Sequence, residues 1–298
     1  MRARIRSSAV PHRRGGHYEP AKCGRRAKSS QATRFSRHDT LNLHPVPTAR
    51  SIPQAVSMTA MRLAASVDQR EVAEASIYEA LLPLAHARIL ELGCGRAEFT
   101  RAIAAHYPDA RIVATEVDTI QHRLNCDNGG QPNVRYVEAG AQAIPADDAS
   151  VDIVLMFKSL HHVPVDLLDT ALAEIRRVLV PGGLAYVSEP VFAGAYNDIV
   201  RIFHDEQQVR LAAFDALFRA VAEARFDLVT EQFFLAPISF ASFEEFERRV
   251  IGVTHTRHCL TAAQHEATRA AFAAHLRPDG AHFRQPMRVD VLRKPSSD

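Results

Sequence analysis

Short apolar runs alternate with helical stretches through the middle of this chain. The runs occupy residues 88–92, 111–116, 134–137, 151–157 and 184–188. Before the last run, Leu168, Leu172, Ile175 and Leu179 repeat at helical spacing. Strands that are apolar throughout and separated by amphipathic helices are typical of a parallel sheet covered on both faces. The pattern therefore predicts an α/β protein with a doubly wound, Rossmann-like sheet.

The pattern changes after residue 191. The predicted elements there are a long helix at about 197–224, a strand at 226–234, and helices at 242–251 and 261–276. The interval 192–285 is therefore expected to be a helical lid, followed by a last strand at 287–293. Asn197 and His204 are seven residues apart, so a continuous helix would place them on one face.

The first 57 residues have a different character from the rest. They hold 12 Lys and Arg against two acids and show no hydrophobic periodicity, which predicts a disordered segment. Three interpretations stay open: a transit peptide, a basic arm for nucleic acid or anionic membrane, or a mis-called start with the true initiator at Met58 or Met61. The folded domain is predicted at 58–298, with its core at 84–191.

Composition excludes several classes of protein. Outside the first 57 residues the chain holds 24 basic and 32 acidic residues, so nucleic acid is not expected as a partner. No apolar run approaches the roughly 20 residues of a membrane helix, so we expect no membrane partner and a cytoplasmic location. The four cysteines form no CxxC pair, which speaks against a disulfide framework or a zinc ribbon. The oligomeric state stays open.

A glycine turn follows the first apolar run. The sequence Leu92-Gly93-Cys94-Gly95 joins a strand to a helix, where glycines allow a tight turn and a close approach of backbone to a ligand. A dinucleotide fingerprint would need Gly or Ala three residues further on, but Glu98 stands there, and its carboxylate would repel a pyrophosphate. A nicotinamide or flavin dinucleotide is therefore disfavoured.

An acidic residue ends the second apolar run. Glu116 lies about twenty residues after the glycine turn, where a carboxylate can accept hydrogen bonds from both ribose hydroxyls. Asp118 is the alternative residue for this contact. Together, the turn and the acid suit an adenosine-containing ligand without a diphosphate.

These segments resemble class I S-adenosylmethionine-dependent methyltransferases. The matching stretches are ILELGCGRAEFTRAIA (89–104), RIVATEVD (111–118), VRYVEAGAQAIPADDASVDIVLMFKSLHHV (134–163) and ALAEIRRVLVPGGLAYVSEPV (171–191). They occur in the family's order and spacing, and the last two are similar to the branch that methylates small molecules and lipids. The resemblance implies a seven-stranded, mostly parallel sheet with an antiparallel last strand.

The resemblance also implies the cofactor, S-adenosylmethionine, and residues that hold it. Glu91, Gly93 and Gly95 would cradle its methionine end, with Cys94 packed inside the same turn. Glu116 would hold the ribose.

The adenine end of the cofactor is implied to lie between Val117 and Ala141. The family often has Asp where this chain has Gly140. The contact of that carboxylate with the adenine amino group would pass to Gln142 or to backbone.

Candidate catalytic residues follow the fourth and fifth predicted strands. The resemblance implies that Phe157 and Lys158 border the site, and Lys158 could bind an anionic acceptor or the cofactor carboxylate. His161 or His162 could serve as a general base, or could instead be a structural element at the start of a helix. Glu189 could bind a cationic or hydroxyl group of the acceptor, or form a salt bridge at the strand end.

The function predicted from the sequence is methyl transfer from S-adenosylmethionine to a small-molecule acceptor. The alternative is a degenerate or regulatory scaffold that binds the cofactor without transferring the methyl group; a nicotinamide-dependent oxidoreductase is a weaker option. His255, His258 and Cys259 would share a helical face, but no fourth metal ligand is evident. No metal site is therefore expected.

Overall fold

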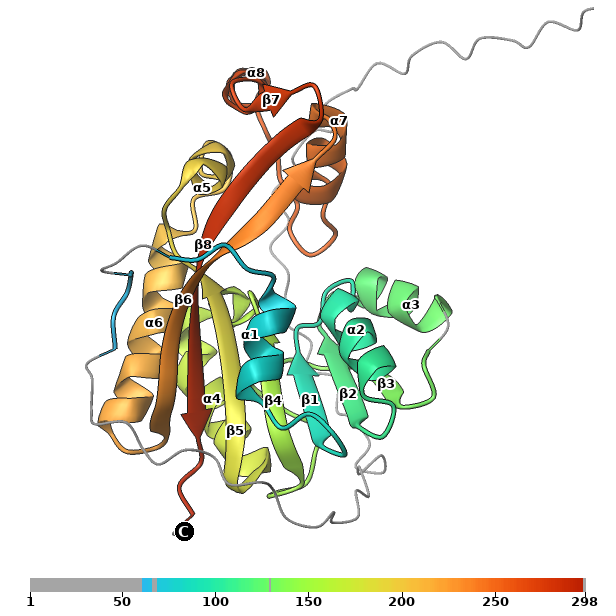
Figure 1. The fold of residues 1–298 in the computed structure, drawn as a ribbon, viewed down its shortest axis with the longest axis vertical. Helices are drawn as coiled ribbons and strands as arrows, with labels where there is room; N and C mark the ends of the chain where they lie inside the picture. Colours follow the sequence, from blue (N-terminus) through green and yellow to red (C-terminus); the bar gives the residue numbers. More distant parts are fainter. Residues whose placement is uncertain (1–60, 66–68, 129, 297–298) are drawn as a thin grey trace, which may run out of the picture. The chain divides into compact units, whose positions relative to one another are not determined.

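A computed structural model describes residues 61–65, 69–128 and 130–296 of the chain (Figure 1). The interpretations of residues 1–57 lie outside the described residues. None of the described helices is both long enough and apolar enough to cross a membrane.

One mixed sheet forms the centre of the described chain. Its strands are β1 (Arg88–Leu92), β2 (Arg111–Glu116), β3 (Val134–Glu138), β4 (Val151–Phe157), β5 (Leu179–Pro190), β6 (Asp227–Phe240), β7 (Leu276–Arg277) and β8 (Gly280–Arg293). They are ordered β3-β2-β1-β4-β5-β8-β6, with the short β7 paired to β8. Strands β1 to β5 pair in parallel, and β8 runs antiparallel to both β5 and β6. The predicted fold class is confirmed.

Helices cover both faces of this sheet. They are α1 (Glu74–Leu81), α2 (Glu98–His106), α3 (Thr119–Asp127), α4 (Leu168–Val178), α5 (Ala195–Val200), α6 (Gln207–Ala222), α7 (Phe243–Phe246) and α8 (Ala262–Ala273), with a 3-10 turn η1 at Leu160–His162. Residues of α4 and α6 pack in one buried apolar cluster with the sheet. Residues of α1 and α2 pack in a second cluster.

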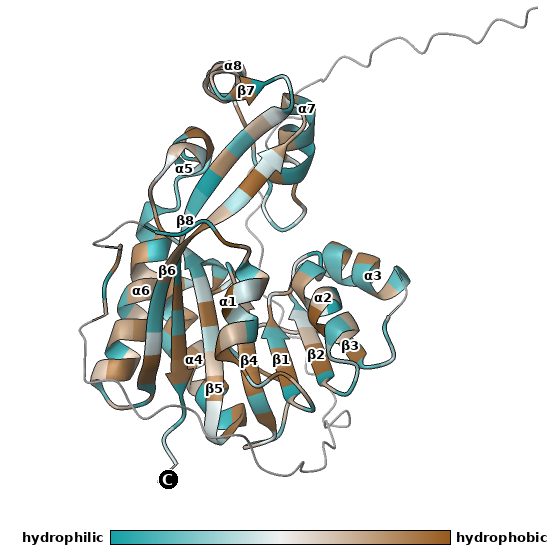
Figure 2. Ribbon diagram, viewed as in Figure 1, coloured by the Kyte–Doolittle hydropathy of each residue, from teal (hydrophilic) through white to brown (hydrophobic). Residues whose placement is uncertain are grey.

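Strand β4 explains why the central strands are apolar throughout. Ile153 and Leu155 belong to the cluster with α1 and α2, whereas Val154 and Met156 belong to the cluster with α4 and α6. Side chains alternate between the two faces of a strand, so a strand covered on both faces has no polar side. Figure 2 shows β4 coloured mainly as hydrophobic.

The lid predicted at 192–285 is not purely helical. Strands β6 and β8 each span 14 residues, and the pairing of β5 with β8 ends at Pro190 and Met287. Beyond that point β6 and β8 stay paired as far as Phe240 and Ala281, so they project past the sheet as a two-stranded ribbon (Figure 1).

Residues 235–240 and 280–285 lie inside the predicted helical lid but form strands, for a reason visible in the sequence. Pro237 and Pro286 lie inside the ribbon, and proline is disfavoured within a strand because it cannot donate a ladder hydrogen bond. The ribbon carries α5, α7 and α8, and an aromatic core holds them together; its buried members include Phe240, Phe246 and Phe272.

Burial in β4 predicts a large cost for truncation. Ile153 is 1% exposed, so Ile153→Ala should lower the free energy of unfolding by about 2–5 kcal/mol because it removes buried methylene groups and leaves a cavity. Urea denaturation followed by circular dichroism measures the change. Ile120→Ala is the matched control, since Ile120 is 56% exposed and should change stability by only about 0.5 kcal/mol. Equal losses in both variants would contradict the proposed packing.

Candidate functional site

The glycine turn at the carboxyl end of β1 has the backbone that its sequence predicts. Gly93 and Gly95 have φ angles of 69° and 52°, in the left-handed region that glycine adopts most readily. A Cβ atom added to Gly93 would lie 2.9 Å from Cβ of Ser159, whereas one added to Gly95 would meet nothing within 4 Å. The turn therefore packs closely against the end of β4 at Gly93 and leaves open space at Gly95.

Glu116 ties this turn to the end of β2. Its carboxylate accepts the backbone N–H of Gly95 at 2.7 Å, of Val117 at 2.8 Å and of Asp118 at 2.9 Å. An ionised carboxylate has about four acceptor positions, so these three donors leave part of its capacity for a ligand. Asp118 instead caps α3, since its Oδ1 accepts the N–H of Ile120 at 3.0 Å.

Glu91 is a buried acid on the adjacent strand. It is 2% exposed and accepts the hydroxyl of Thr100 at 2.5 Å. Burial raises the pKa of Glu91 to about 7, and the nearby Glu116 carboxylate adds to the increase. Near neutral pH this group is therefore poised to ionise when a cation approaches.

Gln142 occupies the space of the missing side chain at Gly140. Its side-chain Oε1 and Nε2 lie 2.5 and 2.7 Å from the position that a Cβ of Gly140 would take. The neighbouring Ala141 is buried, and Val117 is 62% exposed despite being apolar. The Gln142 amide is thus placed where the family's usual carboxylate would begin.

An aromatic group surrounds the end of β4. The ring of Phe99 stacks on Phe157 at a centroid distance of 4.3 Å, and Tyr78 of α1 meets Phe157 edge-on at 5.7 Å. The ammonium of Lys158 lies 5.5 Å from the centre of the Phe99 ring, a distance at which a cation and an aromatic face attract. Lys158 thus rests on the aromatic group.

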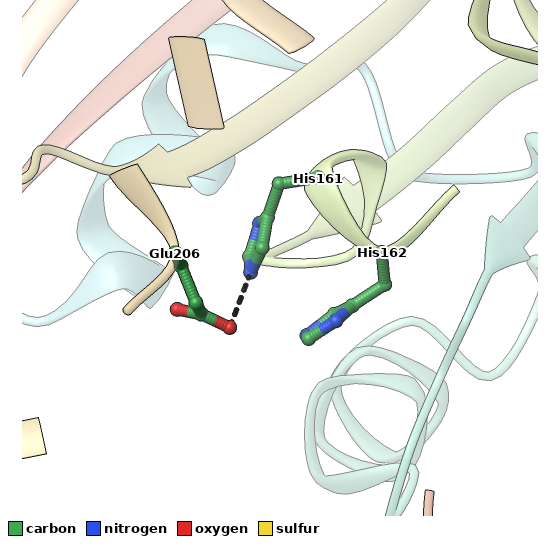
Figure 3. A group of neighbouring side chains, drawn as sticks. All are labelled: His161, His162 and Glu206. Carbon is green, nitrogen blue, oxygen red and sulfur yellow. Dashed lines mark ion pairs between the residues drawn. The ribbon is translucent and has the colours of Figure 1, made fainter. Parts of the chain in front are cut away.

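His161 lies between the carboxylates of Glu189 and Glu206, and Figure 3 shows the second of these. It is buried, its Nδ1 pairs with Glu189, and its Nε2 is 3.6 Å from Oε1 of Glu206. Burial by itself would lower the pKa of His161, but the two carboxylates raise it to about 9. A ring protonated at neutral pH has no free lone pair, so this arrangement does not favour His161 as a general base.

Glu189 faces inward, toward this histidine. It is 4% exposed, and its Oε1 accepts the N–H of Leu160 at 2.9 Å while its Oε2 pairs with His161. Arg288 stands opposite on β8. Burial would raise the pKa of Glu189, but the charge and hydrogen bond of His161 lower it. Of the two interpretations of Glu189, these contacts favour the strand-end salt bridge.

Glu206 is a site residue that sequence reasoning missed. It lies in the connection between α5 and α6, where its Oε1 accepts from Nε2 of His204 at 2.9 Å and its Oε2 from Arg210 at 2.6 Å. Because α5 ends at Val200, Asn197 and His204 do not share a helical face as predicted. A residue in a connection between two helices belongs to no hydrophobic repeat, so the sequence pattern does not indicate Glu206 as a site residue.

His162 differs from His161 in exposure and charge. Its ring is exposed, and its centroid lies 4.1 Å from that of His161 and 5.3 Å from that of His255. Partial burial and the neighbouring His161 cation lower the pKa of His162 to about 4, so the ring is neutral at pH 7.

Two further histidines belong to the same neighbourhood. The ring of His258 lies 4.7 Å from that of His204. The segment that carries His255, His258 and Cys259 is not helical, so the predicted helical face does not exist. His255 and His258 instead approach the core from a loop.

A known family model matches residues 89–183, and its description is a methyltransferase domain. The malonyl-[acyl-carrier protein] O-methyltransferase of Methylococcus capsulatus is 33% identical over 98 residues, which are 33% of this chain and 35% of that protein. A ubiquinone/menaquinone biosynthesis C-methyltransferase of Hahella chejuensis is 30% identical over 126 residues, 41% of this chain and 49% of that protein. The chain thus spans half or less of the length of these relatives.

Solved structures share the fold over a larger part of the chain. The YcgJ protein of Bacillus subtilis superposes with a TM-score of 0.51 and 19% identity, covering 74% of this chain and 97% of that one. A structure described as a putative methyltransferase of Bacillus halodurans gives a TM-score of 0.50 at 18% identity, covering 74% and 98%. At this identity the likeness concerns the fold alone.

The glycine turn generates a prediction about stability. Gly93→Ala should lower the free energy of unfolding by about 1–3 kcal/mol, because alanine is strained at this φ and its Cβ would crowd Ser159. Thermal and urea unfolding measure the effect. Gly130→Ala is the control, since its nearest neighbour would be 3.8 Å away and its φ is not in the left-handed region; a loss as large as that of Gly93→Ala would refute the explanation.

Proposed function

We propose that this chain transfers a methyl group from S-adenosylmethionine to a small-molecule acceptor. The match of residues 89–183 to a methyltransferase domain supports this proposal. The observation that carries the proposal is the contact of Glu116 with the N–H of Gly95. It brings an acid and an open glycine turn together at the carboxyl edge of the sheet, where ligands of such folds bind.

The residues of this edge fit the cofactor. The open space beside Gly95 would admit the methionine end, and the buried Glu91 would face its ammonium group. Glu116 has acceptor capacity left for the ribose hydroxyls. Glu91 and Glu116 both lie at this edge, and two carboxylates there suit a nucleoside without a diphosphate better than one that carries it.

The adenine ring would lie against Val117. An apolar side chain that is 62% exposed offers a flat contact surface, which a bound ring would remove from water. The side-chain amide of Gln142 can both donate and accept hydrogen bonds, so it can replace the carboxylate of the family's usual Asp toward the adenine amino group.

The bound cofactor supplies a methyl group activated on a sulfonium. The chain itself must then align the acceptor with that group and exclude water, and it needs a base only if the acceptor loses a proton early. Tyr78, Phe99 and Phe157 form an apolar wall that serves the exclusion of water. Of the three predicted catalytic residues, only His162 is exposed and neutral, so it is the one available to accept a proton.

Binding of S-adenosylhomocysteine tests the proposal directly. Isothermal titration of the full chain should show one site, and Glu116→Gln should weaken it by about 10- to 100-fold because a hydrogen bond to a charged group is lost. Glu266→Gln, on the exposed face of α8, is the matched control and should leave the affinity unchanged. A folded protein that does not bind the ligand would overturn the proposal.

Transfer is tested separately from binding. A panel of small molecules with hydroxyl, amine, thiol and activated-carbon acceptors is incubated with methyl-labelled S-adenosylmethionine and the full chain. Label in a product supports the enzyme, and the acceptor that takes it defines the acceptor atom. Tight binding with no labelled product from any class would favour the scaffold without transferase activity.

The pKa of Glu91 predicts how binding depends on pH. Below a pKa of about 7 the free protein holds this acid protonated, and only the ionised form attracts the ammonium of the ligand. The affinity for S-adenosylhomocysteine should therefore rise by up to about tenfold per pH unit as the pH approaches 7, then level off. Titrations from pH 5.5 to 8 measure this, and Glu91→Gln should flatten the profile. An equal slope in that variant would exclude Glu91 as the cause.

A further inference from the structure

Three side chains beside the proposed acceptor position bring their ligand atoms together. They are His161 and His162 of η1 and Glu206 of the connection between α5 and α6, and one ligand atom from each lies within 4.8 Å of the others. In Figure 3 the two rings and the carboxylate face a common space. Among the described residues no other three His, Cys, Asp or Glu side chains come this close.

The buried histidine is already oriented as a metal ligand would be. Metal-binding histidines usually donate their second ring N–H to a carboxylate, which fixes the ring and its tautomer. His161 makes this contact through Nδ1 with Glu189, so that Nε2 points toward Glu206. A metal ion bound at Nε2 would displace the proton that this nitrogen carries while the ring is charged.

The two oxygens of the Glu206 carboxylate also face different partners. Arg210 holds Oε2 of Glu206 at 2.6 Å, so Oε1 is the atom that faces the histidines. This arrangement fixes the carboxylate in place. Oε1 also accepts from Nε2 of His204 at 2.9 Å and has a second lone pair for a cation.

Several ring nitrogens around the same point have no hydrogen-bond partner. Within the part of the chain that the structure describes, no hydrogen bond is found for the rings of His162, His255 or His258. Yet His255 contacts His162, and His258 contacts His204. Each neutral imidazole keeps one nitrogen lone pair, so these three rings offer lone pairs to a cation close to the Glu206 carboxylate.

We propose that His161, His162 and Glu206 bind a divalent transition-metal ion, with Zn²⁺ as the ion of first choice. Two imidazoles and one carboxylate suit Zn²⁺, whereas Mg²⁺ prefers oxygen ligands. Three protein ligands leave a further position for water or substrate, and the exposed His162 places that position toward solvent. This proposal departs from the sequence-based expectation of no metal site, because the sequence does not indicate that Glu206 lies beside the two histidines.

The position of the ion suggests a role in catalysis, and this role rests on the proposed function. At the open position the ion would bind a hydroxyl oxygen of the acceptor and lower its pKa, so that its proton could leave to solvent water without a protein base. His162 would then be a ligand and could not accept the proton, which makes the two roles of His162 mutually exclusive.

Metal binding is tested without cofactor or acceptor, so the result does not depend on the proposed function. The full chain is stripped with a chelator and titrated with Zn²⁺ against a fluorescent competitor. His162→Ala should weaken one site by at least about 100-fold, while His106→Ala, which removes an exposed histidine of α2, should leave that site intact. Equal Zn²⁺ affinity and stoichiometry in wild type and His162→Ala would overturn the proposal.

Two further measurements guard against a folding artefact. Co²⁺ in place of Zn²⁺ should give a visible absorption spectrum in the wild type that is lost in His162→Ala, whose circular dichroism should be unchanged because the ring is exposed. Glu189→Gln should weaken binding by about 10- to 100-fold, since it removes the partner that orients His161. Wild-type affinity in Glu189→Gln, or Mg²⁺ displacing Zn²⁺ at equal concentration, would contradict the assigned ligands.

Binding of S-adenosylhomocysteine is measured in the same variants. Undiminished binding of that ligand by His162→Ala, together with loss of Zn²⁺, would separate the two sites and support the metal proposal. No Zn²⁺ site in a wild type that still binds S-adenosylhomocysteine would reject the metal site alone.

Discussion

The hydrogen bonds of the Glu116 carboxylate are the constraint on which the rest of the site depends. This side chain, at the end of β2, accepts the N–H of Gly95 in the turn after β1. It also accepts the N–H groups of Val117 and Asp118, the two residues that follow Glu116. A buried carboxylate is stable only when it is hydrogen-bonded or paired, and here backbone donors fulfil that need. The turn is thereby held in place beside this carboxylate, with open space at Gly95.

The parts of the fold that could be predicted are those whose physical cause is local. A strand covered on both faces needs apolar side chains on both, so β4 was visible as a nearly continuous run, interrupted by Asp152, which pairs with Arg88. The glycine turn was visible because its φ angles exclude most other residues. In both cases a short stretch of sequence carries the whole constraint, and the structure agrees with it.

The rest could not be predicted because its cause is not local. Strand β8 begins at Gly280, but Pro286 in its middle argues against a strand, and only pairing with β6 stabilises that segment. Glu206 lies in a break between two helices, where neither period nor composition distinguishes it from a solvent-exposed acid. Its significance comes from His161, which is 45 residues earlier in the chain and reaches it only through the packing of α6 on η1. A long-range ion pair of this kind leaves no pattern in the sequence.

Buried carboxylates are stabilised differently in the two parts of the site. Around β1 and β2, three backbone N–H groups satisfy the Glu116 carboxylate, and the space beside Gly95 stays open. Around β4, β5 and the start of α6, charged side chains neutralise one another: Glu189 and Glu206 enclose His161, and Arg210 closes the group. Such a group is costly to bury unless every member is paired, so removing Glu206 would leave Arg210 without its buried partner. The connection between α5 and α6 is therefore held against η1 and the end of β5 by charge as well as by apolar packing, so the position of the lid depends on these buried ion pairs.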